Sequence, residues 1–120
     1  MAIKINKSLL NGVVIEEGNN DNGYYIKYDN GTMICTSTKT ISEWNYEYKY
    51  HVGVWTYPKA FIETPNVFSS AFDWSTYSII IKTNPIKEYC SLMGHIIDPV
   101  TNDFIQGSIY MSLFAIGRWK

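Results

Sequence analysis

The amino-acid sequence predicts an all-β protein, an antiparallel β-sandwich preceded by a short N-terminal tail. Several short runs of β-forming residues follow one another at near-regular spacing, with turn residues between them. No stretch after residue 20 has the apolar period of an amphipathic helix. The chain has 120 residues, of which 46% are hydrophobic and 18% are charged, and this composition suits the core of one domain.

Residues 1–20 differ from the rest of the chain because they are polar, lack aromatic rings and end in the loop-like GNNDNG (18–23). We expect them to form a linker or attachment segment, with a short helical turn near Lys7–Leu10. Residues 21–120 are then the β-sandwich domain.

The segment GYYIKYDNGTMICTSTKT (23–40) predicts the first hairpin. Its turn is Asp29-Asn30-Gly31, whose residues tolerate positive φ, and β-forming runs flank it on both sides. Side chains alternate between the two faces of a strand. One face of the first strand therefore carries Tyr24, Ile26 and Tyr28, and one face of the second carries Met33 and Cys35.

The stretch EWNYEYKYH (43–51) alternates strictly and predicts one long, half-buried strand that continues to Val54. Its even-numbered face would carry Trp44, Tyr46, Tyr48, Tyr50, Val52 and Val54, and the other face Asn45, Glu47, Lys49 and His51. Because a sugar-binding surface has no use for the two valines, we interpret the even face as a wall of the core or of a subunit interface. The alternative, a ligand platform, applies mainly at its Trp44 end.

Further strands are expected in NVFSSAFDW (66–74), SIIIKT (78–83), YCSLMGHII (89–97) and the apolar run from Ile109 to Ile116. The segments 78–83 and 109–116 are apolar on both faces, which predicts central positions in a sheet. The segment DPVTND (98–103) is a polar turn.

The sequence contains no recognisable catalytic or metal-binding motif, so we expect no enzyme, cofactor or metal. His95 lies in an apolar run and is expected to be structural, and Cys35 and Cys90 are expected to be buried free thiols. The net charge of −1 and the lack of a basic stripe argue against nucleic acid as a partner. No apolar run reaches the length of a membrane span.

Three segments, in this order, resemble the C-terminal domain of bacteriophage and prophage tail-fibre proteins, in the group with an H-type-lectin-like β-sandwich. They are GYYIKYDNGTMIC (23–35), VWTYPKAFIETPNV (54–67) and SLFAIGRWK (112–120). The resemblance covers roughly the last hundred residues. The segments 43–51 and 84–104 depart from the family pattern, and variable segments on a fixed scaffold are where binding specificity usually lies.

The resemblance implies a homotrimeric receptor-binding tip that attaches to a bacterial surface glycan. It also implies a place in the virion, assembly in the bacterial cytoplasm, and contact with other tail proteins through the N-terminal segment. The alternative is a structural trimerisation or baseplate attachment module with no ligand of its own. Aromatic and polar side chains suited to sugar binding are the candidate glycan contacts: Trp44, Asn45, Glu47, Asp73, Trp74, Ser75 and Tyr77. The candidate subunit contacts are Tyr46, Tyr48, Tyr50, Arg118 and Trp119.

Overall fold

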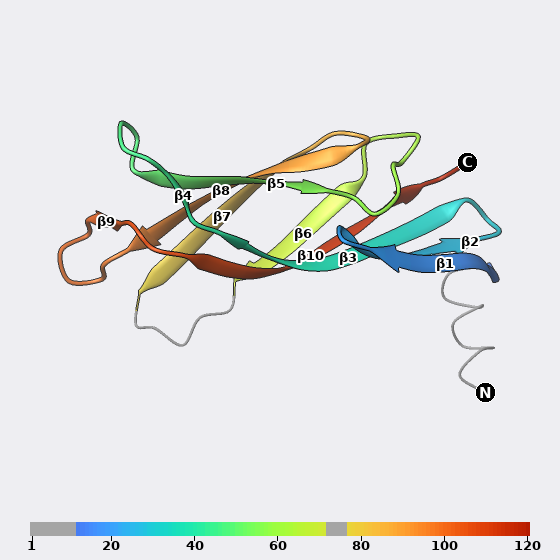
Figure 1. The fold of residues 1–120 in the computed structure, drawn as a ribbon, viewed down its shortest axis with the longest axis horizontal. Helices are drawn as coiled ribbons and strands as arrows, with labels where there is room; N and C mark the ends of the chain where they lie inside the picture. Colours follow the sequence, from blue (N-terminus) through green and yellow to red (C-terminus); the bar gives the residue numbers. More distant parts are fainter. Residues whose placement is uncertain (1–11, 72–76) are drawn as a thin grey trace.

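The protein is a sandwich of two antiparallel β-sheets (Figure 1). The computed structural model describes residues 12–71 and 77–120, and all the regular secondary structure within these two ranges is β. The strand order is β1-β2-β3-β10-β6 in the first sheet and β4-β5-β8-β7 in the second, where β9 also pairs with β8. The predicted fold class is confirmed.

Each sheet combines strands from both halves of the sequence. The strands of the first sheet are β1 (Val14–Asn20), β2 (Gly23–Tyr28), β3 (Thr32–Ile41), β6 (Asn66–Ala71) and β10 (Ile109–Arg118). Those of the second sheet are β4 (Glu43–Asn45), β5 (Tyr50–Thr56), β7 (Ser78–Pro85), β8 (Tyr89–Ile97) and β9 (Phe104–Ile105).

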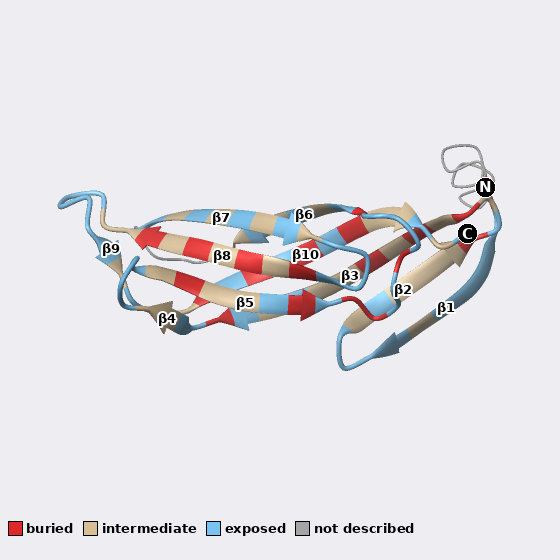
Figure 2. Ribbon diagram, turned by 90° about the horizontal axis from the view of Figure 1, so that it is seen from above, coloured by how far each residue is buried: buried red, intermediate tan, exposed pale blue. Residues whose placement is uncertain are grey.

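The core lies between the two sheets, and buried residues alternate with more exposed ones along β3, β8 and β10 (Figure 2). Three of its aromatic rings pack edge to face, with centroid distances of 5.2 Å from Trp55 to Tyr57 and 5.1 Å from Tyr57 to Phe61. Cys35 and Cys90 are free and fully buried, as predicted.

The predicted first hairpin is confirmed, because β2 and β3 are joined by Asp29-Asn30-Gly31. Gly31 has a φ of 94°, and its N–H donates to the Tyr28 carbonyl at 3.1 Å. The two described ends of the chain meet at this turn. The Asp29 N–H donates to the Val13 carbonyl at 2.8 Å, and the Trp119 N–H donates to the Gly31 carbonyl at 2.9 Å.

Two expectations about individual strands need correction. Residues 14–20 are not a linker, because they form β1 and pair with β2 at the edge of the first sheet. The segment 78–83 is not central, because β7 lies at the edge of the second sheet and Ile80 is exposed. The helical turn expected near Lys7–Leu10 lies outside the described residues.

The strand β10 does lie in the middle of its sheet, between β3 and β6, as predicted. However, only its inward face is buried in this chain, since Tyr110 and Phe114 on the outward face are exposed. The expectation of burial on both faces is therefore wrong for the single chain.

Candidate functional site: an aromatic tip

The stretch 43–54 forms a hairpin and not one long strand. The strand β4 ends at Asn45, residues 46–49 form a turn, and β5 begins at Tyr50. The Asn45 carbonyl accepts from the Lys49 N–H at 2.7 Å, and the Asn45 side-chain Oδ1 accepts from the Tyr48 N–H at 2.9 Å. Asn is favoured at the start of such turns because its side chain can replace a backbone acceptor. Lys49 has a φ of 56°, which completes the reversal of the chain.

The turn places the two halves of the predicted aromatic face on opposite sides of the sheet. Trp44 pairs with His51, so both point inward, whereas Asn45 pairs with Tyr50 and both point outward. His51 is fully buried, and Val54 is 48% exposed. The interpretation of this face as a wall of the chain's own core is therefore wrong, and its role in a subunit interface stays a prediction.

The β4–β5 hairpin, β9 and the beginning of β7 lie at one end of the sandwich, opposite the end that carries the C-terminus (Figure 1). The strand register agrees with this view, because Ile97 at the end of β8 pairs with both Ser78 and Phe104. Six aromatic residues lie at this end: Trp44, Tyr46, Tyr48, Tyr50, Tyr77 and Phe104. We call this set the aromatic tip.

Most of the rings at the aromatic tip contact one another. Tyr48 stacks on Tyr50 with a centroid distance of 6.0 Å and an interplanar angle of 17°. Tyr50 meets the edge of His95 at 6.0 Å, and His95 stacks on Phe104 at 4.5 Å. Rings from β5, β8 and β9 thus form a continuous surface on the outward side of the second sheet.

The outermost rings face solvent. Tyr46 is 77% exposed and Tyr48 is 61% exposed, and Tyr77 and Phe104 are also exposed. Trp44 is half-buried: its ring lies 4.8 Å from that of His51, and it meets Tyr46 edge-on at 6.5 Å. An exposed ring fixed by its neighbours loses little conformational freedom when a ligand stacks on it.

His51 is buried in the core at the base of the aromatic tip. Its Nε2 accepts from the Gly107 N–H at 2.9 Å, and its Nδ1 is buried with no hydrogen-bond partner among the described residues. Burial lowers the pKa of this imidazole. Sequence reasoning placed His51 on the outward face, although its alternation with the buried Trp55 was a sign of the inward one. His95, expected to be structural, is half-buried between Tyr50 and Phe104.

The structure brings together only some of the candidate glycan contacts. Glu47 is exposed in the hairpin turn, and Asn45 is half-buried and bonded within that turn. Tyr77 lies at the same end of the sandwich. Asp73, Trp74 and Ser75 lie outside the described residues.

The candidate subunit contacts divide between the two ends of the sandwich. Tyr46, Tyr48 and Tyr50 belong to the aromatic tip, whereas Arg118 and Trp119 lie beside the β2–β3 turn.

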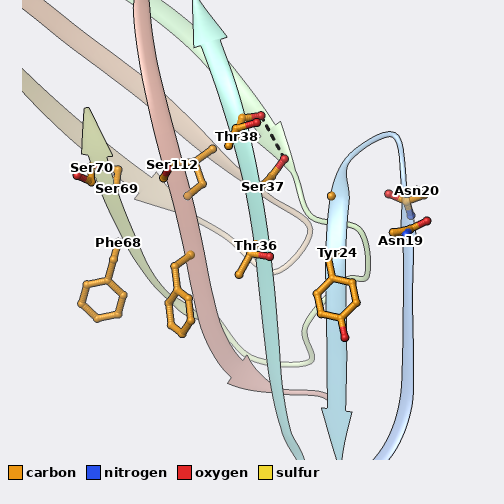
Figure 3. A pocket seen from close by; sticks show the side chains of 13 residues that line it. Asn19, Asn20, Tyr24, Thr36, Ser37, Thr38, Phe68, Ser69, Ser70 and Ser112 are labelled. Carbon is orange, nitrogen blue, oxygen red and sulfur yellow. Dashed lines mark hydrogen bonds between the residues drawn. The ribbon is translucent and has the colours of Figure 1, made fainter. Parts of the chain in front are cut away.

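A hollow of about 750 Å³ lies elsewhere, on the outward face of the first sheet (Figure 3). Hydroxyl-bearing side chains of β3, β6 and β10 line it, together with Phe68, Phe114 and Tyr24. No candidate glycan contact or candidate subunit contact from the sequence lines it. Sequence reasoning missed this surface because β10 was expected to be covered on both faces.

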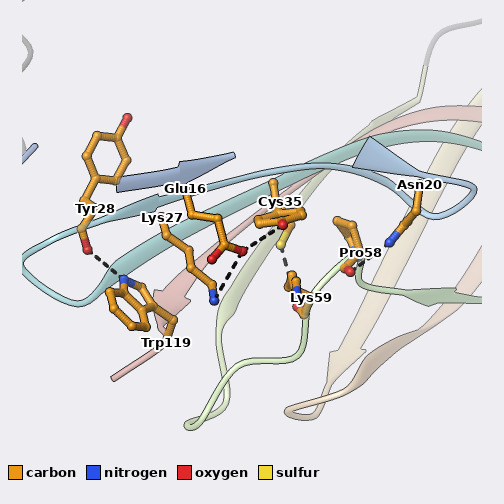
Figure 4. Close-up of polar contacts among 9 residues, drawn as sticks. Glu16, Asn20, Lys27, Tyr28, Cys35, Pro58, Lys59 and Trp119 are labelled. Carbon is orange, nitrogen blue, oxygen red and sulfur yellow. Dashed lines mark hydrogen bonds and ion pairs between the residues drawn. The ribbon is translucent and has the colours of Figure 1, made fainter. Parts of the chain in front are cut away.

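Polar contacts stabilise the end of the sandwich opposite the aromatic tip (Figure 4). The Trp119 Nε1–H donates to the Tyr28 carbonyl at 2.7 Å, and the Lys27 ammonium lies 5.0 Å from the Trp119 ring centroid. Glu16 on β1 accepts from the Tyr25 hydroxyl at 2.8 Å and pairs with Lys27 at 3.6 Å. Trp119 is thus anchored within its own chain.

The described part of the chain brings together no group of three metal-ligating His, Cys, Asp or Glu residues. The Asp98 carboxylate accepts from the Val100 N–H at 2.8 Å, and the Asp98 N–H donates to the Asp103 carbonyl at 3.0 Å. The segment 98–103 is therefore a polar turn, as predicted. Within the described ranges there is no helix long and apolar enough to cross a membrane.

Comparison with known proteins adds evidence about the fold. No family model and no curated protein matches the sequence. Among solved structures, the β-sandwich is similar to a tail-fibre structure. That structure is an N-truncated R1-type pyocin tail fibre, with a TM-score of 0.58 over 95% of this chain and 94% of that one. The two sequences are 12% identical, so the likeness shows a shared tail-fibre-like fold. The H-type-lectin grouping stays a prediction.

Proposed function

We propose that this chain is the receptor-binding tip domain of a phage or phage-like tail fibre, and that its aromatic tip binds a bacterial surface saccharide. The fold shared with the pyocin tail fibre and the three resembling segments support the tail-fibre assignment. One observation carries the assignment of the binding site: exposed, mutually packed rings lie at the end of the sandwich opposite Val13 and Trp119. If the chain is attached to a fibre through the end that carries Val13 and Trp119, the aromatic tip faces away from the fibre.

The chemistry of the tip suits a saccharide. The rings of Tyr46 and Tyr48 offer flat apolar faces against which the C–H groups of a sugar ring can pack. Their hydroxyls and the Glu47 carboxylate offer hydrogen bonds to sugar hydroxyls. Glu47 and Lys49 give the turn one charge of each sign, so hydrogen bonding, and not net charge, would select the ligand.

The test measures binding of the purified chain to an array of bacterial surface polysaccharides and to whole bacteria. The double variant Tyr46→Ala/Tyr48→Ala removes the two outermost rings. The matched control is Tyr89→Ala, which removes an exposed tyrosine from the opposite end of the same sheet. We expect the double variant to bind at least tenfold more weakly, which corresponds to about 1.4 kcal/mol of lost ring contact. The control variant should bind like the wild type.

Equal binding by the wild type and the double variant would contradict the assignment of the site. A wild-type chain that binds neither the polysaccharides nor any bacterium would contradict the function itself. If binding is found, Trp44→Ala and Trp74→Ala extend the map of the site.

The same proposal places the chain in the virion at the tail tip, as a homotrimer assembled in the bacterial cytoplasm. The free thiols of Cys35 and Cys90 support assembly in a reducing compartment. Contact with other tail proteins would involve the N-terminal segment.

A second candidate function is a structural association module that has no ligand of its own. The observation that favours it is the outward face of the first sheet, where exposed Phe68 and Phe114 lie beside Ser70 and Ser112, because it resembles a subunit contact more than a ligand site. Self-association without any polysaccharide binding would support this alternative.

A further inference from the structure

We propose that the outward face of the first sheet is a self-association surface, and that its occupant is a second copy of this chain. The surface lies on β2, β3, β10 and β6. Two rows of paired side chains across β3 and β10 bound it: Ile34 with Ile116 on one side, and Thr40 with Tyr110 on the other. We call it the charge-free face. This proposal depends on the proposed function in one respect only, the expectation that three copies associate.

The strand register arranges this face in rows of similar side chains. One row crosses four strands and carries Tyr24, Thr36, Phe114 and Phe68, and the last two rings are 6.1 Å apart. The next row carries the hydroxyls of Thr38, Ser112 and Ser70. Between the two bounding rows, no outward side chain of these four strands carries a charge.

The charges lie at the border of this face. Glu17 is on the edge strand β1, where it accepts from the Tyr24 hydroxyl at 2.9 Å, and Arg118 is at the end of β10. The outward face of the second sheet is different, because Glu43 and Lys82 line a hollow there. A centre without charges inside a polar border is the usual composition of a protein–protein interface.

The exposed apolar area is large for so small a chain. The four rings of Tyr24, Phe68, Tyr110 and Phe114 are between 36% and 59% exposed. With about 200 Å² for each ring, they expose about 350 Å², within the range of the largest apolar patch on a typical monomer. Four strands and seven residues span about 19 Å by 24 Å, a plane of about 460 Å² and more than half of the roughly 800 Å² per partner of a standard interface.

The shape of the face explains why a second copy fits it. Phe68 and Tyr24 stand on either side of a hollow of about 750 Å³, with Thr36 between them and the small side chains of Ser70 and Ser112 beside them (Figure 3). Bulky rings and a hollow of small residues are thus adjacent on one surface. Each copy therefore offers both a ring and a hollow, so that a ring from one copy can enter the hollow of the next, the head-to-tail contact that closes a ring of three.

The test compares self-association of the full chain and its variants by sedimentation equilibrium between about 1 and 100 µM. The wild type should reach three times the chain mass of 13.8 kDa. Phe114→Lys places a charge at the centre of the face and should weaken association at least hundredfold. Ile80→Lys is the matched control, because Ile80 is similarly exposed on the outward face of the second sheet, and it should associate like the wild type.

A second variant separates loss of association from loss of folding. Ser112→Glu leaves all rings in place and adds a charge at an exposed position that lines the hollow. It should also be monomeric, while its circular dichroism spectrum and thermal unfolding remain those of a folded domain. Retained association by folded Ser112→Glu, or equal effects of Phe114→Lys and Ile80→Lys, would overturn the proposal.

Two further outcomes separate this proposal from the proposed function. A wild type that stays monomeric at 100 µM overturns the self-association surface, and loss of polysaccharide binding in Phe114→Lys would then reassign the face to a ligand. Conversely, a trimer that dissociates in Phe114→Lys but binds no polysaccharide supports the surface and refutes the saccharide function. The Tyr46→Ala/Tyr48→Ala variant should keep the wild-type mass, and a lower mass would instead favour Tyr46 and Tyr48 as the subunit contacts that the sequence predicts.

Discussion

Acid should destabilise this domain through His51, whose imidazole is fully buried at the base of the aromatic tip. Its Nε2 accepts a hydrogen bond from the Gly107 N–H, so the neutral ring carries its proton on Nδ1. Protonation of Nε2 would bury a charge and remove the acceptor of that N–H. Burial therefore lowers the pKa of His51 in the folded chain below its ordinary value of 6.5.

The sign of the pH dependence follows from this shift. Below about pH 6.5 the unfolded chain binds a proton at His51 that the folded chain does not bind, so stability falls as the pH falls. The free energy of unfolding should drop by up to about 1.4 kcal/mol for each pH unit, until the pH reaches the folded pKa. For a domain of this size, a drop of 1.4 kcal/mol lowers the unfolding temperature by about 5 °C.

The assay is thermal unfolding of the wild type and of His51→Gln between pH 7.5 and 5. The Gln side-chain oxygen can accept from the Gly107 N–H and does not titrate in this range. We expect the wild type to lose more stability than His51→Gln between pH 6.5 and 5. Identical pH dependence in wild type and His51→Gln would refute the reasoning.

Two further predictions concern the β2–β3 turn and the core. Gly31→Ala should destabilise the domain by about 1–2 kcal/mol in denaturant unfolding, because Gly31 has a φ of 94° and a Cβ there would overlap the Arg118 guanidinium. Gly107→Ala, whose Cβ would meet only the flexible end of Ile96, is its control, and equal losses would contradict the explanation. Burial raises the pKa of the Cys35 thiol to about 12 and also raises that of Cys90, so a thiol reagent at pH 8 should modify neither in the native chain and both in guanidinium. Rapid modification of either thiol in the native chain would contradict their burial.

The sequence alone was sufficient for features that depend on neighbouring residues. The hairpin at Asp29-Asn30-Gly31 was predictable because positive φ at a turn restricts the residue types. The strand at 89–97 was predictable because β-forming residues cluster there, and the position of β10 between two other strands followed from its apolar residues on both faces. The all-β class follows from the spacing of such segments along the chain.

The sequence failed where pairing between distant segments decides the outcome. The polar residues 14–20 form an edge strand because β2 supplies their backbone partners, and no local pattern reveals this pairing. The strand β7 is apolar on both faces but lies at an edge of the second sheet. In EWNYEYKYH, the alternation predicted one strand, whereas Asn45 begins a turn that reverses the chain.

The sequence by itself therefore determined that this chain is a β-sandwich rich in aromatic rings, because strand propensity and turn chemistry act over a few residues. Only the tertiary structure decided where those rings lie. It placed Trp44 and Tyr50 on opposite faces, buried His51, and gathered Tyr48, Tyr50 and Phe104 at one end. It also left the outward face of β10 uncovered. The physical reason is that the face a side chain occupies depends on strand register and turn length, and one turn residue more or less reverses it.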